Sequence, residues 1–348
     1  MTSRGLLTLL ALPWLLLPAG PTAATEPVEW RLAHYLPERH FFASGWLREW
    51  VESLEAASEG RLRIIVHPNN TLLRLNDIAP GVREGRAELG FGPAPSSPAL
   101  SVLGLPFMAD SAAHGTRIAL RLLADGMLDD DLSGLHVALL QTNAPSLLHT
   151  RSTPVRRPED LEGLRMRGAT PDIRALLAAL GATPVEGFLA PQVYGALRDG
   201  HVDGTIFPYE AMGVFRLAEQ LDYHTEVFLF VSTLGLFINE EALAALPPDL
   251  RDVVLSHSGE TQALAAAQAW DDEEHRGRGL ATAAGNTVLT VDGSALAAWR
   301  AAAERHTHAR LAAIAAEGTD AEALRKRIEA LTVAARRDLQ SPDAAPHR

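Results

Sequence analysis

Cysteine is absent from this sequence of 348 residues, and several kinds of chemistry are excluded with it. Without a thiol the chain can form no disulfide, no cysteine nucleophile and no thiolate metal site. Its stability must therefore come from a hydrophobic core. A chain of this length with 47% hydrophobic residues is long enough for one large or two ordinary globular domains.

The sequence patterns of common catalytic sites are also missing. There is no G-x-S-x-G elbow, no H-E-x-x-H, no G-x-x-x-x-G-K-[ST] and no EF-hand loop. Gly90 and Gly92 begin like a dinucleotide fingerprint, but Pro95 occupies the place of the third glycine. His306 and His308 are two apart on a predicted helix and face different directions, which argues against a metal pair. We therefore expect no catalysis, no cofactor and no metal.

Positive charge is in the minority, with 31 Lys and Arg against 43 Asp and Glu and a formal net charge of -12. A negative field around the whole protein argues against nucleic acid or an anionic membrane surface as a partner. An anionic small ligand stays compatible with it, because one arginine in a cleft can outweigh distant, screened charges. The acidic runs 129–131 and 271–274 are expected to be solvated faces or helix ends rather than acid–base pairs.

No hydrophobic run is long enough to cross a bilayer. The run Leu6–Leu17 has 12 residues and contains Pro13, whereas a membrane span needs about 20 apolar residues. Arg4 before this run and small residues after it predict a secretory signal peptide over residues 1–24, cleaved after Ala24. We therefore expect export to the periplasm; an uncleaved amino-terminal anchor is the alternative.

Extended and helical patterns alternate along the chain. Extended segments are predicted at 28–37, 61–68, 87–92, 135–142, 146–155, 201–208 and 228–239. Helices are predicted at 40–60, 209–221, 240–247 and through most of the alanine-rich last third. Such alternation predicts an α/β fold with helices covering a largely parallel sheet. Trp270 and Trp299 are expected to anchor the packing of their helices.

The stretch DLEGLRMRGATP, residues 160–171, places an arginine between a strand and a helix. Leu164 to Arg167 alternate between apolar and basic residues, as in a short strand, and Gly168 breaks the pattern. Thr170 is a good N-cap and Pro171 fits the first helical position. Arg167 is thereby predicted to lie in a strand-to-helix loop.

Several segments together resemble the solute-binding proteins of tripartite ATP-independent periplasmic (TRAP) transporters, of the dicarboxylate-binding type. The segments in the second half are EDLEGLRMRG, ALGATPV, VYGALRDGHVDG and LFINEEALAALPPDLRDVV. Those in the first half are EWRLAHYLPERH, ASEGRLRIIVHPNNTL, GVREGRAELGFGPAP and LGLPFM. The resemblance covers nearly all of the chain after the signal peptide.

This resemblance implies a two-lobed periplasmic binding protein fold, with hinge strands, a long helix that spans both lobes and a ligand cleft between them. One lobe is expected from 25–145 plus 232–275, and the other from 146–231 plus 276–335. Residues 336–348 are expected to form a disordered tail. Monomers are the usual state in the family.

The resemblance also indicates which residues bind the ligand. The family's carboxylate-binding arginine corresponds to Arg167, whose guanidinium can donate two parallel hydrogen bonds. A structural ion pair is the alternative. Phe207 and Tyr209 replace the commoner polar residues around a proline and become candidate cleft walls, with packing under the hinge as the alternative. Glu210 is expected to begin a helix.

Further candidates come from strand ends, where open α/β sheets present ligand contacts. His34 and Tyr35 follow the first strand, and Phe91 ends the third; ligand contact and core packing are equally consistent with the sequence for each. Arg151 is a possible second anion contact, although its basic neighbours fit a surface equally well.

The sequence therefore predicts a periplasmic protein that closes over a small organic anion and delivers it to the permease subunits of a TRAP transporter. The aromatic residues around position 208 favour an aromatic or branched acid over a plain four-carbon dicarboxylate. A periplasmic ligand-sensing module for a membrane receptor is the alternative. A secreted hydrolase or isomerase is disfavoured by the missing nucleophile.

Overall fold

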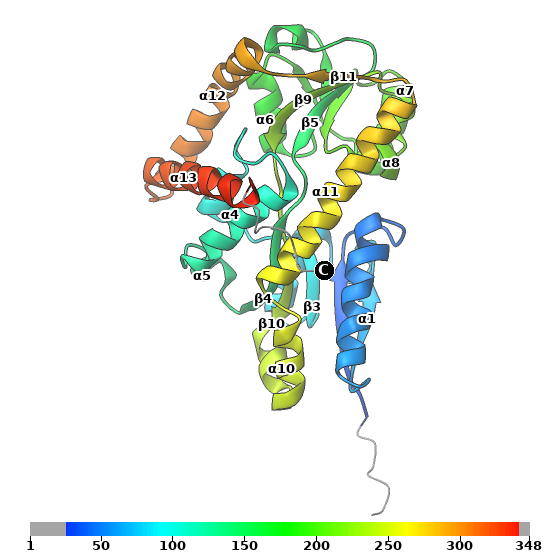
Figure 1. Cartoon of the computed structure of the whole chain (residues 1–348), viewed down its shortest axis with the longest axis vertical. Coiled ribbons are helices and arrows are strands. Elements are labelled where there is room, and N and C mark those ends of the chain that lie inside the picture. Colours follow the sequence, from blue (N-terminus) through cyan, green and yellow to red (C-terminus); the bar gives the residue numbers. More distant parts are fainter. Residues whose placement is uncertain (1–25, 341–348) are drawn as a thin grey trace, which may run out of the picture.

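The computed structural model describes residues 26–340, which form two β-sheets joined by strands and a long helix (Figure 1). The predicted signal peptide lies outside these residues. Within the described residues, no helix combines the length and the apolar character needed to span a bilayer. Figure 1 shows the two sheets one above the other, with α11 running obliquely between them.

The first sheet has the strand order β2-β1-β3-β10-β4, and we call it and its helices lobe 1. Its strands are β1 (Val28–His34), β2 (Leu62–His67), β3 (Leu89–Pro93), β4 (Leu135–Thr142) and β10 (Thr233–Asn239). Its helices are α1 (Arg48–Ala57), α2 (Ile78–Arg83), α3 (Pro98–Leu103), α4 (Ala112–Ala124), α5 (Asp129–Leu132), α9 (Glu240–Ala245) and α10 (Pro248–Ser256).

The second sheet has the order β11-β9-β5-β8-β6-β7, and we call it and its helices lobe 2. Its strands are β5 (Ser146–Thr150), β6 (Arg165–Arg167), β7 (Thr183–Val185), β8 (Gly204–Phe207), β9 (Tyr223–Phe230) and β11 (Thr287–Thr290). Its helices are α6 (Pro171–Ala179), α7 (Val193–Arg198) and α8 (Glu210–Val214), with α12 (Gly293–Ala316) packed on α6. The spanning helix α11 (Glu260–Ala283) contacts α4 and β4 of lobe 1 and α8 and β11 of lobe 2.

The expectation of a largely parallel sheet is only partly correct. β1 pairs in parallel with β2 and β3, but β10 is antiparallel to both of its neighbours, as is β5 in lobe 2. The reason is that both strands arrive directly from the other lobe, without a crossover helix that would reverse the chain. The predicted strand 228–239 correspondingly divides into the end of β9 and all of β10.

The two strand connections between the lobes lie side by side. One joins β4 to β5 and the other joins β9 to β10. The N–H of Asn143 donates to the carbonyl of Ser232 at 3.0 Å, and the N–H of Ser232 donates to Oδ1 of Asn143 at 2.7 Å. These reciprocal bonds hold the two connections together where the chain passes between the lobes.

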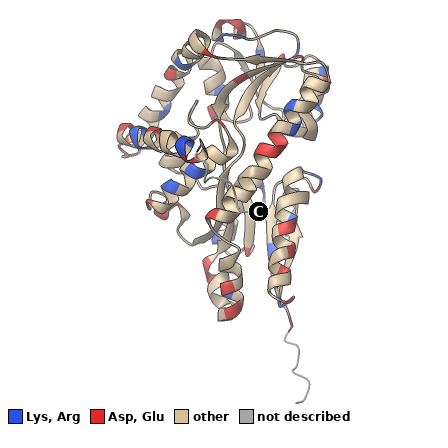
Figure 2. Ribbon diagram, in the orientation of Figure 1, with Lys and Arg blue, Asp and Glu red and all other residues tan. Residues whose placement is uncertain are grey.

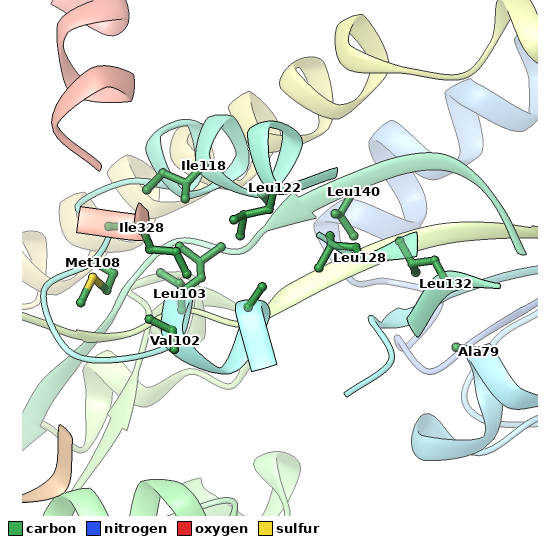
Figure 3. Close-up of a cluster of buried hydrophobic side chains, with 14 of the residues drawn as sticks. Ala79, Val102, Leu103, Met108, Ile118, Leu122, Leu128, Leu132, Leu140 and Ile328 are labelled. Atoms are coloured by element: carbon green, nitrogen blue, oxygen red, sulfur yellow. The ribbon is translucent and has the colours of Figure 1, made fainter. Parts of the chain in front are cut away.

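The carboxyl-terminal helix α13 (Ala321–Gln340) packs on α3 and α4, so it belongs to lobe 1. Figure 3 shows Ile328 among Leu103, Ile118 and Leu122 in the core of that lobe. The expected assignment of residues up to 335 to lobe 2 is therefore wrong for α13. The apolar face of α13 packs against α3 and α4. The sequence shows that this face exists but not which lobe it packs against. The predicted tail also begins too early, because α13 continues to Gln340.

The predicted helix 209–221 is much shorter in the structure, where α8 ends at Val214. Arg216 adopts a left-handed backbone conformation with φ of 57°, which interrupts the helix because a non-glycine residue at positive φ cannot continue it. A single 3-10 turn, Leu217–Glu219, follows.

Candidate functional site

Arg167 lies at the carboxyl end of β6, immediately before the turn into α6. β6 pairs in parallel with β7 and β8, so this end of the strand faces the gap between the lobes. The Oγ1 of Thr170 accepts a hydrogen bond from the N–H of Ile173 at 3.2 Å, and Pro171 is the first helical residue. The predicted capping of α6 is confirmed. Together the short strand and the capped helix fix the backbone on both sides of Arg167.

The side chain of Arg167 is nearly buried, and no carboxylate of residues 26–340 lies within 4.0 Å of it. Its Nε donates to the carbonyl of Phe188 at 3.1 Å, and its Cζ lies 4.8 Å from the ring centre of Phe207. Burial lowers the pKa of Arg167 to about 10, so the guanidinium stays protonated at neutral pH. Arg165 has the opposite environment, since its Nη2 pairs with Oδ1 of Asp203 at 2.8 Å on the surface.

A cavity of about 480 Å³ opens in front of this guanidinium. Lobe 2 contributes Arg167, Ala169, Thr170, Ile173, Leu189, Ala190, Pro191, Ile206, Phe207, Pro208, Glu210 and Phe215. Lobe 1 contributes Tyr35, Leu36, Pro37, His40, Asn69 and Asn70; the strand connections and their flanks contribute Asn143, Ser146, Phe230 and Ser232, and α11 contributes Trp270. The cavity is therefore bounded by both lobes. Among the described residues, Arg167 is the one arginine or lysine that lines it.

The lobe 1 wall is an aromatic stack. The ring of Phe42 lies 4.7 Å from Phe91 and 5.5 Å from Trp270, and Tyr35 lies 6.4 Å from Phe91 with nearly parallel planes. His40 lies 5.7 Å from Trp270. Tyr35, His40 and Trp270 line the cavity, while Phe42 and Phe91 are fully buried behind them. Packing of this kind holds the wall rigid.

A polar pair crosses the cavity between the lobes. Nε2 of His40 in lobe 1 lies 3.8 Å from Oε2 of Glu210 in lobe 2, and both residues are buried. Burial lowers the pKa of His40 to about 4, with a further lowering from His34. Burial also raises the pKa of Glu210 to about 8, and the nearby carboxylate of Glu273 adds to that rise. At neutral pH the pair is therefore predominantly uncharged. Glu210 begins α8, as expected.

Of the sequence-predicted site residues, Arg167, Phe207 and Tyr35 line the cavity. Tyr209 does not: its hydroxyl donates to Oε1 of Glu226 at 3.4 Å, and its ring lies 5.4 Å from those of both His149 and His224. The chain turns into α8 at this point, so the two-residue alternation that would place Tyr209 beside Phe207 no longer holds. Tyr209 packs under the sheet of lobe 2.

The remaining three predicted contacts also lie elsewhere. Phe91 is fully buried behind Tyr35, and His34 faces a separate cavity of about 420 Å³ beside α1. Both follow from the alternation of strand side chains, which turns neighbouring residues to opposite faces. Ser146 begins β5 and lines the cavity, whereas Arg151 follows the other end of that strand. The N–H of Arg151 donates a hydrogen bond to the carbonyl of Asp203.

Sequence reasoning missed His40 and Trp270 as cavity residues. Trp270 does anchor the packing of α11, as expected, but it also lines the cavity. His40 follows the first strand by six residues, and the sequence around it predicts only the start of a helix. Trp299, in contrast, is a fully buried packing residue of lobe 2.

The described residues contain no cluster of three or more His, Asp or Glu side chains with the geometry to hold a metal ion. The acidic run 271–274 is not such a cluster. Asp271 and Glu274 both accept hydrogen bonds from N–H groups at the start of helices, α4 and α8 respectively.

Comparison with known proteins decides the family. Residues 32–312 match the model of the bacterial extracellular solute-binding protein family 7. The chain belongs to this family. It is 24% identical over 293 residues to a solute-binding protein of Roseobacter denitrificans, covering 80% of this chain and 87% of that protein.

Solved structures of TRAP solute-binding proteins share its fold. One, from an unidentified marine microbe, is specific for aromatic acid ligands and holds metahydroxyphenylacetate; it is 28% identical, with a TM-score of 0.81 over 88% of this chain and 99% of its own. The same marine protein was also crystallised with 3-hydroxybenzoate. Another, from Bordetella bronchiseptica, holds both enantiomers of mandelate; it is 25% identical, with a TM-score of 0.76 over 88% of this chain and 99% of its own.

The solute-binding family 7 chain is thus a binding protein for transport, and its predicted two-lobed α/β fold is confirmed. Its function is the binding of a solute outside the cytoplasm. Arg167 lies on the wall of the interlobe cavity.

Proposed function

We propose that this chain captures an aromatic monocarboxylate in the interlobe cavity and delivers it to the permease subunits of a TRAP transporter. The observation that carries the proposal is the single guanidinium of Arg167, nearly buried and without a carboxylate partner among residues 26–340. A buried charge is stabilised by pairing. A ligand carboxylate supplies that missing partner through two parallel hydrogen bonds.

The charge on the wall supports one carboxylate rather than two. Arg167 is the one arginine or lysine that the described residues place there, and His40, with its pKa lowered to about 4, is neutral at pH 7. A second carboxylate would therefore be desolvated without a cation beside it. The walls support an aromatic body, because Tyr35, Phe207 and Trp270 present rings to the same space.

The position of the cavity supports a mechanism of capture by closure. Its walls come from both lobes, so a bound ligand contacts both and favours the conformation in which they are close together. The permease would then receive the closed form. We further propose that the predicted signal peptide directs the chain to the periplasm and that the chain acts as a monomer.

Calorimetry on the chain without residues 1–24 tests the ligand class. We expect benzoate to bind and to raise the melting temperature, and succinate to do neither at the same concentration, since binding to the folded state alone stabilises it. Succinate binding in preference to benzoate would refute the aromatic monocarboxylate. Uptake of labelled benzoate by cells that carry the permease, with and without this chain, tests delivery.

A further inference from the structure

Two buried polar atoms on the cavity wall have no hydrogen-bond partner in the described part of the chain. They are Oε2 of Glu210 and Nε1 of Trp270. Glu210 is 7% exposed and Trp270 is 3% exposed, and both side chains line the cavity. Buried polar groups in folded proteins are normally hydrogen-bonded. Two unpaired ones in the same cavity indicate a polar group of the ligand.

His40 provides a third polar atom at the same place. Its Nδ1 accepts a hydrogen bond from the N–H of Phe42 at 3.3 Å, which assigns the proton of the neutral ring to Nε2. That Nε2–H faces Oε2 of Glu210 across 3.8 Å. This separation is too long for a direct hydrogen bond, but one oxygen atom can lie about 2.8 Å from both atoms. The ring of Trp270 is adjacent, 5.7 Å from that of His40.

We propose that His40, Glu210 and Trp270 form a second polar subsite, which binds a hydroxyl group carried by the ring of the aromatic acid. The inference rests on the proposed function, because it assumes that Arg167 holds the carboxylate of the same ligand. The hydroxyl accepts hydrogen bonds from His40 or Trp270 and shares its own proton with the carboxyl group of Glu210. The ligand class is then a hydroxylated aromatic monocarboxylate.

The charge state of the subsite favours a hydroxyl over a charged group. Burial keeps His40 neutral and raises the pKa of Glu210 to about 8, so most Glu210 is a neutral acid at pH 7. A ligand ammonium would need a carboxylate there, and a second ligand carboxylate would face Glu210 without a cation. The acidic groups facing Glu210 from α11, Glu273 and Glu274, also oppose an anion. A neutral hydroxyl, able to donate and accept, satisfies all three groups.

Calorimetric affinities for benzoate and for 2-, 3- and 4-hydroxybenzoate test the inference. We expect at least one hydroxylated isomer to bind about tenfold or more tightly than benzoate, because benzoate leaves the polar atoms unpaired. In Glu210→Leu and in Trp270→Phe that advantage should fall to about threefold or less, while benzoate itself still binds. Tyr209→Phe is the matched control: it removes a hydroxyl next to Glu210 in sequence that points away from the cavity, and it should keep the full advantage.

The outcomes separate the two proposals. Benzoate binding without any gain from a hydroxyl overturns the subsite and leaves the proposed function standing. Failure of every aromatic acid overturns both. An advantage that survives in both Glu210→Leu and Trp270→Phe, or a tighter affinity for 4-(aminomethyl)benzoate than for every hydroxybenzoate, also overturns the hydroxyl subsite. Since the two variants alter different segments, a folding defect in one leaves the other to decide.

Discussion

Asp271 and Glu274 lie three residues apart on α11, and each caps a helix of a different lobe. Oδ1 and Oδ2 of Asp271 accept from the N–H groups of Ala112 and Ala113, at 2.7 and 2.9 Å, at the start of α4. Glu274 accepts from the N–H of Tyr209 at 2.7 Å and of Glu210 at 3.2 Å, where α8 begins. Figure 2 shows this acidic stretch midway along α11, so one turn of the spanning helix is fastened to both lobes.

Close packing accompanies the second cap. Gly277 follows Glu274 by one turn, and a methyl group there would collide with the carbonyl oxygen of Tyr209. Only glycine lets α11 approach the backbone of α8 this closely. The short distance keeps the carboxylate of Glu274 within reach of the two N–H groups.

Removal of either cap should destabilise the chain. We expect Asp271→Ala and Glu274→Ala each to lower the free energy of unfolding by about 0.5–2 kcal/mol, as for other helix caps, because the helix N–H groups lose their acceptors. Asp271→Asn keeps one acceptor and should cost less than Asp271→Ala. Urea unfolding followed by circular dichroism measures all three. If both alanine variants unfold with the free energy of the wild type, these hydrogen bonds do not stabilise the chain.

Arg167 should dominate ligand affinity. Arg167→Ala leaves the ligand carboxylate unpaired in a desolvated site, so we expect a loss of about 2–5 kcal/mol in binding free energy, measured by calorimetry. Arg167→Lys should recover only part of it, because an ammonium lacks the planar fork. Arg165→Ala is the matched control: its side chain is two residues away on the same strand, pairs with Asp203 at the surface, and should leave affinity unchanged. Equal affinities for the two alanine variants would exclude Arg167 from the site.

The stability of the ligand-free chain should depend on pH through Glu210. Its pKa in the folded state, about 8, is above the ordinary value of 4.5, so between these values the folded state binds more protons than the unfolded state. This contribution is present below about pH 4.5 and is lost as pH rises towards 8. Burial is the main cause, and His40, Glu273, Glu274 and Tyr35 are the titratable neighbours.

Glu210→Gln removes this titration. We expect the variant to gain stability relative to wild type as pH rises from 5 to 8, by on the order of a few kcal/mol, in denaturant unfolding at both pH values. The difference between the two proteins is the informative quantity, because other groups titrate in both. A difference that shrinks with rising pH would contradict the raised pKa.

Ile328 tests the placement of α13 on lobe 1. Its side chain is fully buried among residues of α3 and α4 (Figure 3), so Ile328→Ala should cost about 2–5 kcal/mol of stability through lost burial and a cavity. Val333→Ala, which shortens a side chain that is 48% exposed on the same helix, should cost far less. Similar melting temperatures for the two variants would mean that α13 is not docked on this core.

Local sequence signals predicted the surroundings of Arg167 well. Alternation over Leu164 to Arg167, the break at Gly168 and the cap at Thr170 each depend on residues within one or two turns, and the structure confirms the strand, the turn and the helix. The same alternation could not decide between Phe207 and Tyr209, because the chain leaves the strand between them. Phe207 reaches the cavity, whereas Tyr209 packs behind it.

By itself, the sequence determined the α/β alternation, the family, and an arginine presented at a strand end, because each is written in contiguous residues or in the order of short segments. Only the tertiary structure decided that His40, Glu210 and Trp270 line the same cavity, that α13 covers lobe 1, and that an acidic run caps two helices. Some of these relationships join residues more than two hundred positions apart. They depend on how the lobes pack around α11, and packing distances between distant segments have no local signature in a sequence.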